Sequence, residues 1–294
     1  MPKAKANNIE LEYDTFGDPS SEPLLMIMGL GAQMIRWPEE LCEMFVKKGF
    51  YVIRFDNRDI GLSTKFDDAG IQDIMKAMMK AQRGKTFDAP YTLNDMADDA
   101  AGLLDFLNIE KAHICGASMG GMIAQTFALR HPSRVKSLVS IMSSTGDPGL
   151  PQPGPEAMKV LLTPAPTDRE ANIEHSIKVL RFLYGSGFPF DENYAREFAG
   201  RNYDRSFYPD GLNRQLTAIL ASGSRKEALK ATNIPTLVIH GGDDPLVPLE
   251  GGKDTAESIP NAELLIIDGM GHSLPPETWE QVTDAIARNA RKTH

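Results

Sequence analysis

Six short apolar runs recur along the chain with helical patterns between them, and this alternation restricts the possible folds more than any other feature. The runs are rich in Val, Ile and Leu and carry few charges, at residues 23–29, 50–56, 112–118, 135–144, 235–241 and 262–268. Such runs are typical of strands that are buried on both faces, as in parallel sheets. The chain is therefore predicted to have an α/β fold with a mostly parallel twisted sheet.

The segments between the runs carry helix start and stop signals. Thr92 precedes an acidic first turn, and Pro132 ends an apolar helical pattern. Helices that flank the sheet and connect its parallel strands are predicted at residues 38–48, 92–108, 119–132 and 276–292.

The N-terminal segment has a different pattern. Residues 5–17 alternate between polar and apolar side chains and contain an Asn-Asn pair, Asn7 and Asn8, near their start. Asparagine tolerates the positive φ that a tight hairpin turn needs. We expect an antiparallel hairpin at the edge of the sheet.

Residues 145–223 interrupt the alternation. They begin with the Pro- and Gly-rich stretch GDPGLPQPGP and continue with helical spacing, without a strand-like run. We expect a helical cap at 145–223, inserted in a core domain of residues 1–144 and 224–294 and lying over the strand ends, where α/β sheets place ligands. A second apolar stripe is predicted to pack near the same face, with Ile71, Ile74, Met75, Met78 and Met79.

Composition narrows the function classes. The chain has 294 residues, 41% of them hydrophobic, and a formal net charge of −9. This charge argues against a surface for nucleic acid or anionic membranes, which needs clustered Lys and Arg. Two cysteines, Cys42 and Cys115, are too few for a disulfide framework or a thiolate zinc site. The start lacks a signal-peptide pattern and no window has about 18 uncharged apolar residues, so a cytoplasmic protein is predicted.

A serine stands at the end of the third run, in the sequence HICGASMGGM (113–122). G-x-S-x-G between a strand and a helix leaves room for a sharp turn, because Gly116 and Gly120 have no side chains, and it projects Ser118 from the tip of that turn. A serine hydroxyl needs a neighbouring base to become a nucleophile. Ser118 is the predicted nucleophile.

The base and the acid are expected later in the chain, in the order Ser, acid, His. Of the six histidines, His272 lies in a Gly-flanked loop just beyond the last run, and it is the predicted base. The acid is expected after the preceding run, where Asp243 and Asp244 are both candidates.

An oxyanion needs two backbone donors. The Met119 N–H lies at the first turn of the helix after Ser118, and the loop MGLGAQ (28–33) supplies the Leu30 N–H as the second donor. Apolar walls of a substrate pocket are predicted from Met28, Met34 and Met142, although methionines with this pattern can equally be core residues.

Three of these motifs together resemble the α/β-hydrolase superfamily: GASMGG around Ser118, VIHGGDDPLVP (238–248) and GMGHS (269–273). The resemblance covers nearly the whole chain and implies the α/β-hydrolase fold with a cap. It also implies that Asp244, rather than Asp243, serves His272. A nucleophilic Ser118 distinguishes the chain from relatives with an Asp at that position, which hydrolyse haloalkanes or epoxides.

Two further features resemble the capped serine esterase branch that contains aclacinomycin methylesterase. In FDNRDIGLST (55–64), Asp59 replaces the glycine that is usual in related hydrolases. Met28 precedes Gly29 where many members carry a histidine that braces the oxyanion loop.

The sequence thus predicts a carboxylesterase that cleaves small to medium apolar esters through an acyl-serine intermediate. Its partner is a small-molecule ester, with no nucleic acid, membrane, metal or cofactor. A C–C bond hydrolase, a cofactor-free haloperoxidase or perhydrolase, or an acyltransferase on the same triad remains open, as does a non-catalytic ligand sensor. A dinucleotide-binding oxidoreductase is disfavoured, because GLGAQM has Met34 in place of the third glycine.

Overall fold

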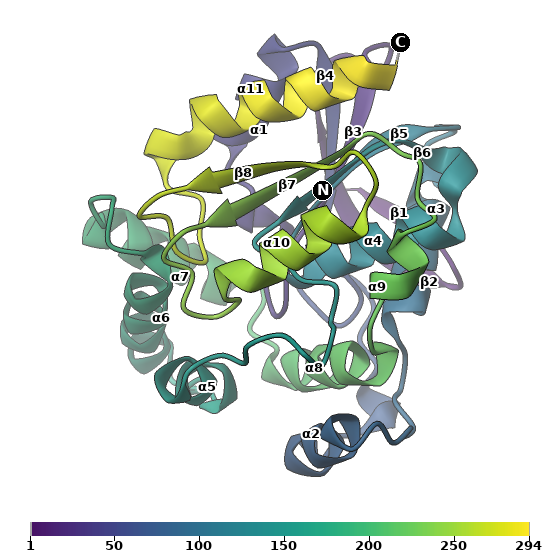
Figure 1. The fold of residues 1–294 in the computed structure, drawn as a ribbon. Coiled ribbons are helices and arrows are strands. Elements are labelled where there is room, and N and C mark those ends of the chain that lie inside the picture. Colours follow the sequence, from purple (N-terminus) through teal and green to yellow (C-terminus); the bar gives the residue numbers. More distant parts are fainter. Residues whose placement is uncertain (1, 294) are drawn as a thin grey trace.

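The computed structural model describes residues 2–293 and has an eight-stranded sheet in that range (Figure 1). The strand order is β1-β2-β4-β3-β5-β6-β7-β8. The strands are β1 (Lys3–Ala6), β2 (Ile9–Phe16), β3 (Glu22–Ile27), β4 (Phe50–Phe55), β5 (Ala112–Ala117), β6 (Val135–Ile141), β7 (Thr236–Gly241) and β8 (Glu263–Ile267). All neighbours from β4 to β8 are parallel, which confirms the predicted sheet.

The apolar runs form the central strands for the expected reason. Every residue of β4, β5 and β7 is buried. The prediction of burial on both faces is wrong for β8, where Ile266 is 37% exposed. This strand pairs only with β7 and forms the sheet edge.

The predicted hairpin is also present at the other edge. β1 and β2 are antiparallel, and the turn residues Asn7 and Asn8 have φ of 47° and 65°. Both values lie in the left-handed region that a two-residue hairpin turn requires. β2 also pairs antiparallel with β4, which joins the hairpin to the sheet.

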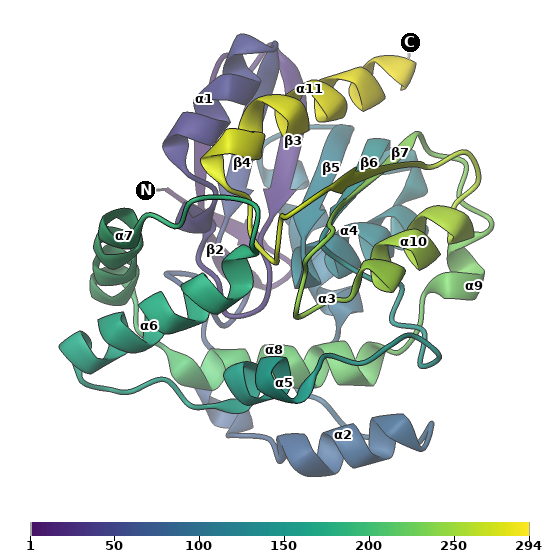
Figure 2. The same ribbon diagram turned by 60° about the vertical axis from the view of Figure 1, so that its left-hand side comes forward.

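Helices cover both faces of the sheet. α3 (Leu93–Phe106) and α4 (Met119–Arg130) pack on one face. α1 (Glu39–Lys47) and α11 (Trp279–Ala290) pack side by side on the other (Figure 2). All four predicted helices are present, with ends within a few residues of the expected ones. Thr92 and Asp95 form a reciprocal capping box at the start of α3.

One crossover helix was not predicted. α10 (Leu249–Ser258) connects β7 to β8, and its sequence LEGGKDTAES has two glycines and little helical periodicity. Gly252 is needed for packing, because a Cβ there would lie 2.4 Å from His240 Nδ1. Tertiary packing overrides weak helix propensity in this segment.

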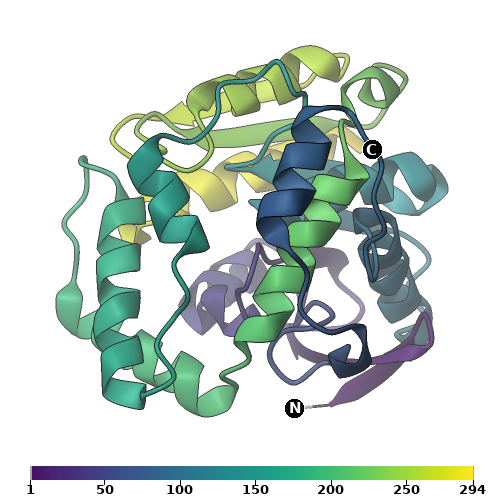
Figure 3. The same cartoon turned by 90° about the horizontal axis from the view of Figure 1, so that it is seen from below.

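Five helices of the described chain lie between β6 and β7: α5 (Pro155–Leu162), α6 (Arg169–Tyr184), α7 (Glu192–Arg205), α8 (Pro209–Ser222) and the short α9 (Lys226–Leu229). α2 (Ile74–Gln82), from the segment between β4 and α3, packs beside α8 (Figure 3). Two backbone bonds join this helical region to the loop after β8, from Gly271 N to Tyr184 O and from Gly187 N to Gly269 O. The division into a core and a cap at 145–223 stays a prediction. Within residues 2–293, no helix is long and apolar enough to cross a membrane.

Candidate active site

Ser118 lies on the turn between β5 and α4 in a strained backbone conformation, with φ 56° and ψ −123°. The turn is possible because two glycines border it. A Cβ on Gly116 would lie 1.9 Å from Gly120 O, and a Cβ on Gly120 would lie 2.1 Å from Ile27 O. The Ser118 N–H donates to Ile141 O at the end of β6 (2.9 Å). The hydroxyl therefore projects from the carboxyl ends of the central strands.

A hydrogen-bond chain runs from this hydroxyl to a buried carboxylate. Ser118 Oγ lies 2.9 Å from His272 Nε2, and His272 Nδ1 lies 2.7 Å from Asp244 Oδ2. The loops after β5, β7 and β8 bring these three side chains together from positions that are far apart in the sequence. Ser118 is half-buried, whereas the side chains of His272 and Asp244 are 7% and 0% exposed. The carboxylate thus acts on the imidazole without competition from bulk water.

Backbone donors hold the Asp244 carboxylate in place. Its Oδ1 accepts from the N–H groups of Leu246 (2.9 Å) and Val247 (2.8 Å), while Oδ2 faces His272. Burial acts to raise the pKa of Asp244, but the charge of His272 and the hydrogen bonds outweigh it, so this pKa lies below the ordinary value. Asp244 is a fixed anion beside the imidazole.

The alternative acid occupies a different environment. Asp243 is exposed and its carboxylate accepts a hydrogen bond from the Ser186 hydroxyl. Of the other histidines, His113 is buried against Ser137, and His131 contacts Asp98. His175 lines the cavity described below.

The loop after β3 approaches Ser118 closely. A Cβ on Gly29 would lie 2.9 Å from Ser118 Cβ, and Leu30 lines the same cavity as Ser118. Met119 begins α4, so its N–H has no intrahelical acceptor. No long helix begins in this glycine loop. A short 3₁₀ turn, η1 (Met34–Arg36), follows it and α1 starts at Glu39, which argues against dinucleotide binding.

Neutral side chains brace this loop where many relatives use a histidine. Asn57 Nδ2 donates to Met28 O (2.8 Å), and Gly31 N donates to Gln215 Oε1 on α8 (2.9 Å). Gln215 is fully buried and also donates to Arg58 O (2.8 Å). The bond to Gly31 occupies that N–H and fixes the peptide next to Leu30. Gln215 was not among the predicted site residues, because nothing in the pattern of a single helix shows which loop it meets.

Two buried ion pairs join the loop after β4 to the helices above it. Asp59 contacts Arg214 of α8 through two bonds of 2.9 Å, and both side chains are at most 1% exposed. Asp56 contacts Arg205 of α7 (2.8 Å) and accepts from Met34 N (2.7 Å). Asp59, which replaces the glycine that is usual in related hydrolases, thus has an ion-pair partner in Arg214 of α8.

A cavity of about 1610 Å³ lies between the strand ends and the helices, and Ser118 and His272 line it. Met28 and Met142 also line it. Met34 does not, contrary to the expectation for a pocket wall: it is fully buried, because η1 starts there and Asp56 fixes its N–H. Four residues of the predicted second stripe contribute to the wall, namely Ile71, Ile74, Met75 and Met78, whereas Met79 does not. Ile71, Met75 and Met79 are all exposed.

These features define a class of protein: an α/β-hydrolase, in which a serine on a strand-to-helix turn contacts an imidazole held by a carboxylate. Such a site can transfer an acyl group without a metal. Within residues 2–293, no three His, Cys, Asp or Glu side chains are grouped so that they could hold a metal ion.

Comparison with known proteins agrees with this class. Residues 22–277 match the family model described as the alpha/beta hydrolase fold, so the chain belongs to that family. It is 30% identical over 315 residues to rhodomycin D methylesterase DnrP of Streptomyces peucetius, with 99% of both chains covered. This similarity confirms the predicted resemblance to an esterase branch.

Two further similarities involve C–C hydrolases. The chain is 33% identical over 208 residues to 2-hydroxymuconate semialdehyde hydrolase of Pseudomonas sp. (strain CF600), covering 67% of this chain and 66% of the relative. The structure of a meta-cleavage product hydrolase from Pseudomonas fluorescens IP01 superposes with a TM-score of 0.76 at 21% identity, covering 100% and 98% of the two chains. The latter likeness supports the fold.

Proposed function

We propose that this protein is a serine carboxylesterase that works through an acyl-serine intermediate. The observation that carries the proposal is the hydrogen-bond chain Ser118–His272–Asp244, which opens on a large and mostly apolar cavity. Sequence similarity to a methylesterase over the full chain supports ester chemistry.

In the proposed mechanism, His272 Nε2 takes the proton of Ser118 Oγ as that oxygen attacks the ester carbonyl. Asp244 holds the Nδ1–H tautomer and stabilises the imidazolium that forms. The N–H groups of Met119 and Leu30 bind the developing oxyanion. His272 then protonates the leaving alcohol, and water, activated by the same imidazole, releases the acid.

The cavity supports a substrate with a substantial apolar part. Its volume of about 1610 Å³ is larger than that of most small-ligand sites, so esters well beyond a butyrate fit inside it. We therefore propose apolar esters of small to medium size as substrates, with room for larger ones. Cytoplasmic location stays a prediction.

The test is hydrolysis of p-nitrophenyl esters from acetate to decanoate by the wild type and by Ser118→Ala. We expect turnover by the wild type and a loss of about 10³-fold or more in the variant. Cys42→Ser serves as a control, because Cys42 lies on the fully buried side of α1 and outside the cavity wall. A folded wild type without turnover on any of these esters would contradict the proposal.

A C–C bond hydrolase is the second candidate, and the similarity to 2-hydroxymuconate semialdehyde hydrolase favours it. An assay with 2-hydroxymuconate semialdehyde, in which hydrolysis is monitored by the decrease in the absorbance of this compound, distinguishes the two candidates. Activity on this compound that exceeds activity on all esters would replace the esterase proposal.

A further inference from the structure

Arg36 lies in the wall of the cavity and has no anionic partner among residues 2–293. It ends η1, is half-buried, and its guanidinium carbon lies 5.1 Å from the ring centre of Phe198 on α7. Within the described range 2–293, its side chain makes this ring contact and neither a hydrogen bond nor an ion pair. None of its nitrogens is fully sealed from solvent or from the cavity.

Three other arginines that lie beside the helical region and are shielded from solvent have acceptors. Arg205 pairs with Asp56, and Arg214 pairs with Asp59. Arg225, which also lines the cavity, donates to oxygens of Gln125, Gly223 and Ser144. An unpaired guanidinium in a partly desolvated place is unusual, because burial without a partner costs free energy. Arg36 thus has free donors that no acceptor in the described part of the chain uses.

The surroundings of Arg36 are aromatic. Tyr184 and Tyr194 line the same cavity, and burial lowers the pKa of Arg36. Tyr184 connects this part of the wall to the base, because its carbonyl accepts from Gly271 N (3.0 Å) and from Ser273 Oγ (3.3 Å) on either side of His272. A ligand that reaches Ser118 shares one cavity with the guanidinium.

We propose that Arg36 forms an anion-binding subsite and that the substrate is an ester that also carries a carboxylate. The inference rests on the proposed esterase function. A planar guanidinium matches a planar carboxylate with two parallel hydrogen bonds. The protein has a net charge of −9, so a local cation is required to attract an anionic substrate into the cavity.

The test compares matched neutral and anionic esters. p-Nitrophenyl butyrate is neutral, mono-p-nitrophenyl glutarate carries the carboxylate on its acyl part, and 4-carboxyphenyl butyrate carries it on the leaving group. In Arg36→Met, which keeps the aliphatic stem, we expect kcat/KM for at least one anionic ester to fall by about 10- to 100-fold, mainly through KM. The value for p-nitrophenyl butyrate should change by less than about threefold, and Arg36→Lys should retain part of the preference.

Arg181→Met is the matched control. Arg181 also stacks on a ring, with its guanidinium carbon 4.6 Å from the centre of Phe190, but it pairs with Glu192 and is exposed. In this variant, kcat/KM should not change for any one of the three esters relative to the other two. Equal loss for neutral and anionic esters in Arg36→Met, or no loss for either anionic ester, would overturn the proposal.

A binding measurement separates this proposal from the proposed function. Two ligands are compared by calorimetric titration: monobenzyl glutarate, which carries a carboxylate, and benzyl methyl glutarate, in which that carboxylate is a neutral methyl ester. Each is titrated into the Ser118→Ala variant and into the double variant that carries both Ser118→Ala and Arg36→Met. Tighter binding of the monoester that disappears with Arg36 supports the subsite even if no ester is turned over. Equal binding of both compounds to Ser118→Ala would overturn the subsite while leaving the esterase proposal intact.

Discussion

At the scale of single residues, the site depends on a serine in a backbone conformation that only its neighbours make possible. Ser118 has φ 56°, and Gly116 and Gly120 leave no room for a Cβ. Asp244 stays ionised because backbone donors and His272 surround it. The pKa of Asp244 lies below the ordinary value of 3.8, so its carboxylate is ionised throughout the neutral range and becomes protonated only at strongly acidic pH.

Replacing Asp244 by Asn tests the role of this charge. A neutral amide at this position would favour the wrong imidazole tautomer, so kcat should fall by about three to four orders of magnitude with little change in the melting temperature. Asp243→Asn is the control, since Asp243 contacts the Ser186 hydroxyl and not the imidazole. Steady-state rates and thermal melts check both variants, and similar rates for the two would speak against the assignment.

At the scale of elements, the loop after β4 and helix α8 depend on one buried ion pair. Asp59 has φ 67°, a conformation that costs an ordinary residue about 1–2 kcal/mol and glycine almost nothing. Removing the Asp59 side chain would remove this strain, but it would also remove the only carboxylate that Arg214 contacts in the described structure. A buried charge left without a partner costs about 3–5 kcal/mol. The ion pair outweighs the strain.

Asp59→Gly should therefore destabilise the protein by about 1–4 kcal/mol, although it restores the glycine that is usual in related hydrolases. The free energy of unfolding in urea measures the effect. Adding Arg214→Met should recover part of the loss, because the unpaired charge is then removed. A stability gain in Asp59→Gly alone would show that backbone strain is the larger contribution.

The contact between α8 and the loop after β3, which holds the proposed oxyanion donor Leu30, gives a second prediction at this scale. Gln215→Met removes the acceptor of the Gly31 N–H, so the Leu30 N–H should lose its fixed position. We expect kcat to fall by about 10- to 100-fold with KM nearly unchanged, less than the loss of a whole donor. Gln215→Glu keeps an acceptor for Gly31 and should retain more of kcat. An equal change in both variants would place Gln215 outside the positioning of this loop.

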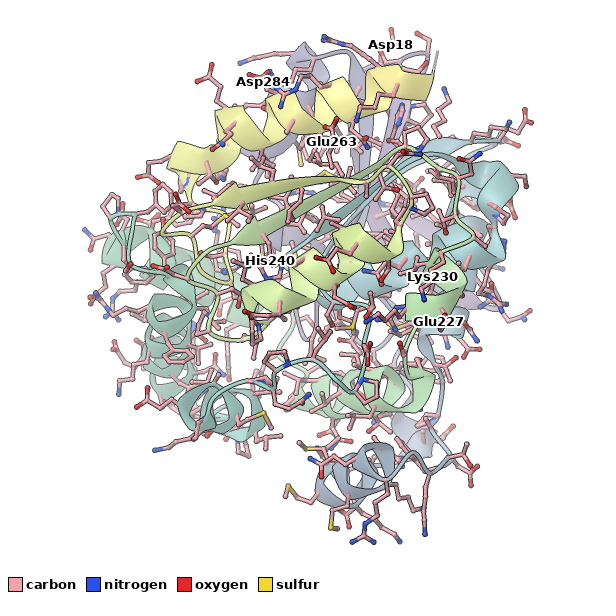
Figure 4. All side chains as sticks on the ribbon, viewed as in Figure 1. Asp18, Glu227, Lys230, His240, Glu263 and Asp284 are labelled. Carbon is pink, nitrogen blue, oxygen red and sulfur yellow. The ribbon has the colours of Figure 1, made fainter. Side chains whose placement is uncertain are left out.

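At the scale of the whole molecule, two histidines whose pKa is lowered by burial couple the free energy of unfolding to pH. His240 at the end of β7 lies beside α10 (Figure 4), and its Nε2 is 2.8 Å from Val247 O. Burial lowers the pKa of His240, and burial also lowers that of His175. In the window between the ordinary pKa of 6.5 and the lower folded value, the unfolded chain binds more protons than the folded one.

The free energy of unfolding should consequently fall as the pH drops below about 6.5, by at most about 1.4 kcal/mol per pH unit for each histidine. Urea unfolding at several pH values measures this slope. His240→Asn should have a shallower slope than the wild type, whatever its stability at pH 8. An unchanged slope would mean that His240 is not the group that takes up the proton.

Much of this molecule could be predicted from local patterns. Apolar runs predicted the strands because burial on both faces excludes charge, and Asn7-Asn8 predicted the hairpin because of its turn chemistry. α10 was not predicted because Gly251 and Gly252 lower its helix propensity. Only tertiary packing explains these glycines, since Gly252 lies against His240 and Gly251 lies against Ser144. Arg36 was not among the predicted site residues for the same kind of reason. Its proposed role depends on the absence of a partner among residues 2–293, which no sequence pattern reveals.

The central claim is that Ser118 becomes acylated, and trapping that intermediate tests it most directly. The wild type is mixed with excess p-nitrophenyl butyrate, quenched in acid within milliseconds, digested and analysed by mass spectrometry, while the p-nitrophenol burst is recorded. We predict a burst approaching one equivalent of active sites and one butyryl group on the peptide that contains Ser118, both absent in Ser118→Ala. Turnover without a burst or an acylated peptide, persisting in Ser118→Ala, would contradict the account.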